Sequence, residues 1–166
     1  TVISAGRTDT NNLRDQGQTI IHANTIFNSA EFGIRFDAGA RDTWPHPGSV
    51  ALLREVNTQR LIPGIAIENN LIAFGGEGGI LFSGENDEIP EDMPIAAVPF
   101  GRIVNNTIFG ATGSGIGVGV QVTENASPTI LNNILAGLDT GVEIDASSTT
   151  TVIGANVYQN NQTNTI

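Results

Sequence analysis

The chain has 166 residues, of which 17 are acidic and seven are arginine, and its formal net charge is -10. It contains no lysine and no cysteine, which excludes a disulfide framework, a thiol nucleophile and a lysine Schiff base. The acidic balance argues against nucleic-acid binding, because that requires clustered basic side chains. No apolar run is long enough for a bilayer, so we expect no membrane span.

The sequence contains a repeat built around an asparagine. One short alternating segment precedes the asparagine, a second follows it, and a third begins with a glycine. The asparagines are Asn24, Asn70, Asn106, Asn133 and Asn156, and the glycines are Gly33, Gly79, Gly115 and Gly141. Such short segments, with inward apolar and outward polar residues, are typical of strands. A single coil cannot bury its inward face, so we expect stacked coils forming one domain over residues 1–166.

Two residue types are expected to shape the corners of each coil. Asparagine tolerates a left-handed backbone, and stacked asparagine amides hydrogen-bond from one layer to the next. The five asparagines therefore predict a structural ladder at one corner. Glycine is expected to supply the unusual backbone angle of the following corner.

The spacings between the asparagines are 46, 36, 27 and 23 residues, and the shortest approximates one bare coil. The excess predicts insertions between each glycine-led strand and the strand before the next asparagine. These insertions cover residues 40–62 and 84–97, with a short one near 119–127. Because 46 is twice 23, the first gap also admits a degenerate coil around Val50–Val56. We favour an insertion, because no asparagine stands at the required corner.

The pattern Asn-x-Ile followed by Gly-Ile-x-Phe/Val resembles the right-handed parallel β-helix repeat of the pectate-lyase-like superfamily in its broad sense. The tail from Gly119 to Asn161, which includes the run Ala126–Ile134, also resembles segments of large bacterial surface proteins. The resemblance covers about residues 19–160. It implies an all-β, right-handed parallel β-helix of about five coils, each of three short strands, with loop insertions at one corner. The same coil hosts lyases, hydrolases, adhesins and spacers, so the fold does not specify a function.

In polysaccharide-active members of this superfamily the substrate groove lies outside one sheet, and the glycine-led strands beside the insertions are the analogous place. The candidate catalytic residues there are Arg35, Asp37, Glu143 and Asp145. A glycosidase needs two carboxylates, and Glu143 and Asp145 lie two residues apart on one strand face. Solvated outward side chains are the alternative interpretation. The Gly-His-Gly and Arg-x-Lys motifs of polygalacturonase-like members are missing, so we lean against an enzyme.

Two further groups of residues are candidate sites. Trp44 and His46, in the longest insertion, are a candidate ligand-binding pair, because tryptophan stacks on sugar rings. The alternative is a loop side chain packed on the flank of the coils. An acidic run supplies oxygen ligands of the kind that calcium prefers, and its alternative is a solvated loop. The acidic residues are Asp87, Glu88, Glu91 and Asp92. No other cofactor is expected.

We favour a non-catalytic structural or binding module of a bacterial surface or secreted protein, located outside the cell. The repeat stops at Ile166 without a capping helix, which predicts partners at uncapped coil ends. Those partners are either further copies, stacked end to end into a filament, or flanking domains of a larger chain. The alternative function is a polysaccharide lyase or glycoside hydrolase, and polysaccharide is also a candidate ligand.

Overall fold

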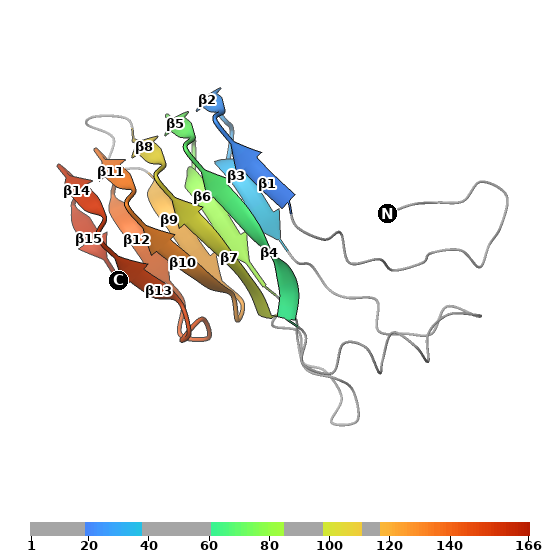
Figure 1. Cartoon of the computed structure of the whole chain (residues 1–166). Helices are drawn as coiled ribbons and strands as arrows, with labels where there is room; N and C mark the ends of the chain where they lie inside the picture. The colour runs from blue at the N-terminus through green and yellow to red at the C-terminus, as the bar shows by residue number, and fades with distance from the viewer. Residues whose placement is uncertain (1–18, 38–60, 85–97, 111–116) are drawn as a thin grey trace, which may run out of the picture.

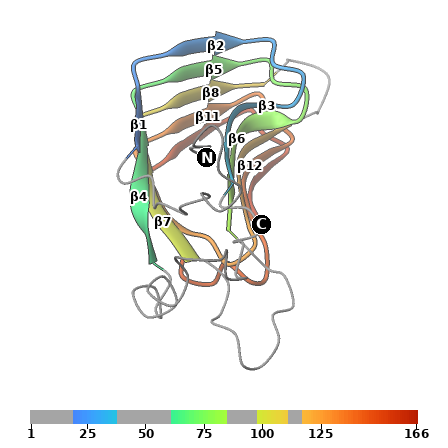
Figure 2. The ribbon, with the colours of Figure 1, turned by 90° about the vertical axis from the view of Figure 1, so that its right-hand side faces the viewer.

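A computed structural model describes residues 19–37, 61–84, 98–110 and 117–166 (Figure 1). This part of the chain forms fifteen short strands and three parallel sheets of five strands each. The chain passes through the three sheets in turn and then repeats the circuit, as Figure 2 shows. The predicted fold is confirmed: the molecule is a three-faced, right-handed parallel β-helix of about five coils.

Each coil contributes one strand to each sheet. Sheet A is formed by β1 (Thr19–His22), β4 (Leu61–Glu68), β7 (Val98–Val104), β10 (Ser127–Leu131) and β13 (Val152–Gly154). Sheet B is formed by β2 (Thr25–Phe27), β5 (Leu71–Ala73), β8 (Thr107–Phe109), β11 (Ile134–Ala136) and β14 (Val157–Gln159). Sheet C is formed by β3 (Phe32–Asp37), β6 (Gly78–Ser83), β9 (Val118–Thr123), β12 (Thr140–Ile144) and β15 (Thr163–Thr165).

The core consists of rows of equivalent apolar side chains that stack from coil to coil. In sheet A the row consists of isoleucines alone: Ile21, Ile67, Ile103, Ile130 and Ile153. In sheet B the row is Ile26, Ile72, Ile108, Leu135 and Tyr158. Residues of the three middle coils in these rows are at most 1% exposed. The in-register pairing of branched side chains buries the inward face that a single coil would leave in water.

The tight connection between sheets A and B, which we call the Asn corner, carries the asparagine ladder. Asn24 Nδ2 donates to Asn70 Oδ1 at 3.0 Å, and the same bond links each later pair at 3.0 Å. The sequence pattern predicts a left-handed backbone at the ladder asparagine itself. In the structure, the residue before each ladder asparagine is left-handed instead. These residues are Ala23, Asn69, Asn105, Asn132 and Ala155. The preceding residue makes the turn, and the ladder asparagine is left free to bond along the stack.

The role predicted for the glycine-led positions is wrong in one respect. Gly33, Gly79 and Gly141 lie inside β3, β6 and β12, and none of the three has a positive φ. Their requirement is space. A Cβ on Gly79 would meet the Ile108 side chain and would lie 2.7 Å from the carbonyl oxygen of Gly119. Glycine is therefore needed at these positions because it lets neighbouring coils approach closely, and not because the backbone turns there.

The third coil also differs from the predicted register. Val118 pairs with Gly78, and Gln121 pairs with Leu81, so the equivalent of Gly79 is Gly119 and not Gly115. The extra residues of this coil lie between β8 and β9, on residues 110–117, and not near 119–127. The two long connections do run from sheet C to sheet A, over residues 38–60 and 84–97. β1 pairs directly with β4, so residues 38–60 join neighbouring coils of the stack.

Candidate functional site

The outer face of sheet C carries the candidate catalytic residues of the sequence. Pairing places Arg35, Leu81, Gln121 and Glu143 in one row across β3, β6, β9 and β12. Asp37 lies beside Ser83 in the neighbouring row. Arg35 and Glu143 are therefore three strands apart, or about 14 Å at about 4.8 Å for each strand. The sheet brings Arg35 near Asp37, and Glu143 near Asp145, but it keeps the two pairs apart.

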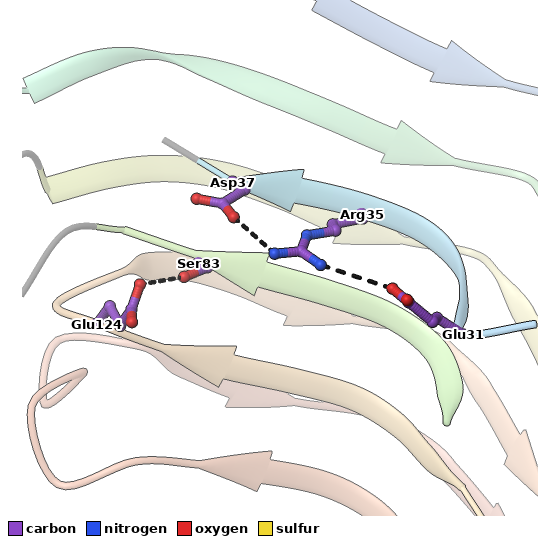
Figure 3. A network of polar contacts seen from close by, with 5 residues as sticks. All are labelled: Glu31, Arg35, Asp37, Ser83 and Glu124. Carbon is purple, nitrogen blue, oxygen red and sulfur yellow. Dashed lines mark hydrogen bonds and ion pairs between the residues drawn. The ribbon is translucent and has the colours of Figure 1, made fainter. Parts of the chain in front are cut away.

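Arg35 forms a small exposed ion cluster at one end of this face (Figure 3). Its Nη2 donates to Asp37 Oδ2 at 3.0 Å, and its Nη1 lies 3.6 Å from Glu31 Oε2. The hydrogen bond and charge of Asp37 raise the pKa of Arg35 above its usual value. A guanidinium held in this way stays protonated, so it serves as a cation and not as a proton acceptor.

Asp145 forms a turn at the other end of the face. Its side chain accepts hydrogen bonds from the backbone N–H groups of Glu124 at 2.7 Å and Ser148 at 2.8 Å. The Ser147 hydroxyl donates to it at 2.8 Å. Partial burial opposes ionisation, but bonds from Glu124, Ser148 and Ser147 outweigh it and hold the pKa below the ordinary value. Asp145 is thus a charged cap of the turn after β12 and a poor proton donor.

Glu124 and Ser83 connect the middle coils between these two ends. The buried Ser83 hydroxyl donates to Glu124 Oε2 at 2.7 Å, as drawn in Figure 3. Glu124 also donates its backbone N–H to Asp145. This chain of contacts joins β6, the turn after β9 and the turn after β12. Its members hold consecutive coils together at the corner that carries the long connections.

Within the described residues, no group of three or more histidine or acidic side chains is arranged to hold a metal ion. In the same ranges, no helix is long and apolar enough to cross a membrane. The candidate calcium ligands Asp87, Glu88, Glu91 and Asp92 lie outside the described residues. The candidate ligand-binding pair, Trp44 and His46, also lies outside them.

Sheet B has an outer face that the sequence interpretation missed, because outward residues were expected to be polar. It is lined by large apolar side chains that are 37–56% exposed: Phe27, Leu71, Phe109, Ile134 and Val157. None of its five strands contains a charged residue, and neither does the Asn corner beside it. The phenylalanine three positions after Asn24 and after Asn106 is the signal that could have revealed this face, since strand alternation points it outward.

Phe74 adds a third ring to this surface. Its ring centroid lies 6.4 Å from that of Phe27, in a stacked arrangement, and 6.1 Å from that of Phe109, edge to face. The backbone of Phe74 has a φ of 61°, and the side chain is 44% exposed. The equivalent positions in the other coils are Asn28, Gly110, Gly137 and Asn160, residue types that tolerate this angle better than a bulky residue does. The three rings form what we call the aromatic ridge.

Comparisons with known proteins add no relationship to this picture: no protein family, no curated protein and no solved structure matches the chain.

Proposed function

We propose that this domain is a non-catalytic structural or binding module of an extracellular, surface or secreted protein, built on the pectate-lyase-like coil in its broad sense. The observation that carries the proposal is the directionality of the asparagine ladder. Each of the first four ladder asparagines donates, through Nδ2, to the Oδ1 of the asparagine in the next coil. The ladder therefore has an acceptor end and a donor end that are complementary.

The two ends are Asn24 and Asn156. In later coils, the Oδ1 of the ladder asparagine accepts two hydrogen bonds from the asparagine of the preceding coil. In the ranges that the structure describes, no donor reaches the corresponding Oδ1 of Asn24. Asn156 Nδ2 donates to the Ile130 carbonyl, and its second hydrogen has no acceptor among the same residues. A further coil placed on either end would satisfy these groups, and either a second copy or flanking sequence of a larger chain would supply such a coil. Head-to-tail contacts of this kind generate filaments unless they close.

The groups on sheet C support a structural role in preference to catalysis. Asp145 caps a turn, Glu124 accepts from Ser83, and Arg35 is held by Asp37 and Glu31. The contacts of Asp145 and Glu124 join neighbouring coils, and those of Arg35 lie within its own coil. A lyase or hydrolase would instead require several of them to converge on one substrate bond.

The edge strand β15 gives a sharp test of end-to-end stacking. Thr163 donates its backbone N–H to the Asp139 carbonyl at 2.8 Å, so the alternating residue Asn164 directs its N–H away from β12. Asn164→Pro removes that outward donor, and Asn164→Ala is the matched control that keeps it.

We expect the wild type and Asn164→Ala to form rods that lengthen with concentration in light scattering and negative-stain microscopy, and Asn164→Pro to remain short. Strictly monomeric wild type at high concentration would overturn the filament proposal. Turnover of acidic or neutral polysaccharides that is abolished by Glu143→Gln and by Asp145→Asn would overturn the non-catalytic proposal.

A further inference from the structure

We infer that the outer face of sheet B is a docking surface for a second copy of this chain, independent of end-to-end stacking. The face is distinguished by charge. The described residues include eight acidic side chains, and all lie in sheets A and C or at the other corners. Sheet B and the Asn corner contain none. Two copies of a chain with a net charge of -10 repel each other, and this is the described face on which they meet with the least repulsion.

The exposed side chains of this face are large and apolar. Phe27 is 51% exposed, Ile134 43% and Val157 56%. An uncharged sheet with contiguous exposed apolar residues marks an interaction surface more often than a solvated one. Water contact at these residues is unfavourable, and burial against another apolar face removes it.

The aromatic ridge supplies a second observation. Phe74 keeps a left-handed backbone angle, with a φ of 61°, where other coils have asparagine or glycine. Strained angles at bulky residues persist where something else requires the side chain, and they gather at functional sites. The ring is 44% exposed, so the core does not require it. The strain places the Phe74 ring between those of Phe27 and Phe109 and completes the ridge over three coils.

The shape of the outer face of sheet B indicates that the partner that docks there is another copy of the chain. The row that includes Phe27 and Phe109 continues with Ala136 and Gln159 in the fourth and fifth coils. Beside Ala136, Gly137 has no side chain. The ridge of the first three coils is therefore followed by a low step. If two copies face each other with opposite coil order, the first two coils of each ridge lie over the other copy's step, and the third coils, which carry Phe109, meet at the two-fold axis of a self-complementary contact.

The size of the face sets the strength of this contact. Five strands about 4.8 Å apart, with their short corners, give a face of about 24 Å by about 17 Å, or about 400 Å² for each copy. The total of about 800 Å² is below the range of stable complexes and falls among weak, reversible ones. We therefore expect a dimer that forms only at high protein concentration, and that long stacks strengthen by presenting many such faces together.

Sedimentation equilibrium over a wide concentration range, in the Asn164→Pro background that blocks end contacts, tests the inference. Phe109→Asp places a negative charge at the centre of the face and is expected to weaken dimerisation by at least about tenfold, because two like charges then meet across the two-fold axis. Val152→Asp adds the same charge on sheet A, where the native side chain is 55% exposed, and is expected to leave dimerisation unchanged. Circular dichroism checks that both variants fold.

The absence of cysteine allows a second test of the orientation. Opposite coil order brings the third coil of one copy against the third coil of the other, so Thr107→Cys should be joined to its counterpart by a short bis-maleimide. Thr129→Cys, on the outer face of sheet A, is the control that should stay monomeric. Equal cross-linking of the two variants, equal weakening by the two aspartates, or a wild-type face that stays monomeric at every concentration would overturn the inference.

Discussion

Two sides of the same coils differ in almost every respect. The side made by the Asn corner and sheet B has tight connections, one hydrogen-bonding pattern repeated in all coils and no charged residue. The side made by sheet C and its following corner has the long connections and a different set of polar contacts in each coil. The repeated contacts that hold the stack together and the contacts that vary from coil to coil therefore lie on separate faces. The stack stays regular at the Asn corner and sheet B, while the residues of sheet C and its following corner differ between coils.

The comparison predicts the largest loss of stability on the repeating side. Asn106 is 1% exposed, donates to Ile67 O and Asn133 Oδ1, and accepts from Asn70. Asn106→Ala leaves several buried groups without partners and is expected to lower the free energy of unfolding by about 3–5 kcal/mol. Chemical denaturation measures the loss. The exposed end of the ladder provides the control: Asn24→Ala should cost about 1 kcal/mol, and equal losses would contradict the importance of burial.

The second largest loss of stability is expected for a substitution on the inner side of sheet C, where the variable side of the coil also has a repeated packing contact. Gly79→Ala forces the new methyl group against Ile108 and the Gly119 carbonyl, and neither can withdraw freely. We expect a loss of about 1–3 kcal/mol from overpacking. Gly154→Ala is the control, since its nearest neighbour is the flexible end of Leu131 at 3.0 Å. Similar melting temperatures for the two variants would show that coil spacing adapts more easily than this geometry allows.

Asp145 should show a smaller effect that depends on pH. Its pKa is lower in the folded than in the unfolded chain, so its contribution is present above the unfolded pKa and is lost as pH falls through the folded pKa. Asp145→Asn should cost about 1 kcal/mol at neutral pH, as loss of a cap does. The gap between wild type and variant should narrow in acid below about pH 4, near the unfolded aspartate value. Unfolding curves at a series of pH values measure the gap, and a gap that widens in acid would refute this assignment.

The smallest effect is expected on the variable side, at the exposed ion cluster. Arg35→Ala breaks contacts between side chains that are 57%, 61% and 35% exposed. Surface ion pairs of this kind contribute little to stability, and salt weakens them further. Thermal melts at low and high salt provide the measurement. A loss comparable to that of Asn106→Ala would mean that the two sides of the coil do not differ as proposed.

Much of the fold follows from residue spacing, because a solenoid contact joins equivalent positions of successive repeats. Asn106 belongs to the corner ladder and Ile108 to an inward row, and each has an equivalent in every coil. The sequence therefore predicts both the corner and the row. The register of the third coil was wrong, because Gly115 and Gly119 offer competing matches to one pattern and only strand pairing distinguishes them. The left-handed residue was misplaced by one position for a similar reason, since Asn105 and Asn106 stand side by side.

The candidate site was less predictable than the fold. Arg35 and Glu143 occupy equivalent strand positions, but their separation depends on how many coils lie between them. The aromatic ridge depends on Phe74, a corner residue whose direction is set by its backbone angle and not by strand alternation. A repeat pattern locates residues along the coil, whereas a site requires their positions across the stack and around the corner.

The parallel pairing of coils has a mechanical consequence. The hydrogen bonds that join coils run along the stack, and the bonds of the asparagine ladder, from Asn24 at one end to Asn156 at the other, run the same way. Tension along the stack therefore places the full load on every coil-to-coil boundary, and the weakest boundary separates first. Tension along the strands loads the bonds of all five coils together. A module of this shape resists force best when it is held across its coils, so its tolerance of load depends on how it is anchored.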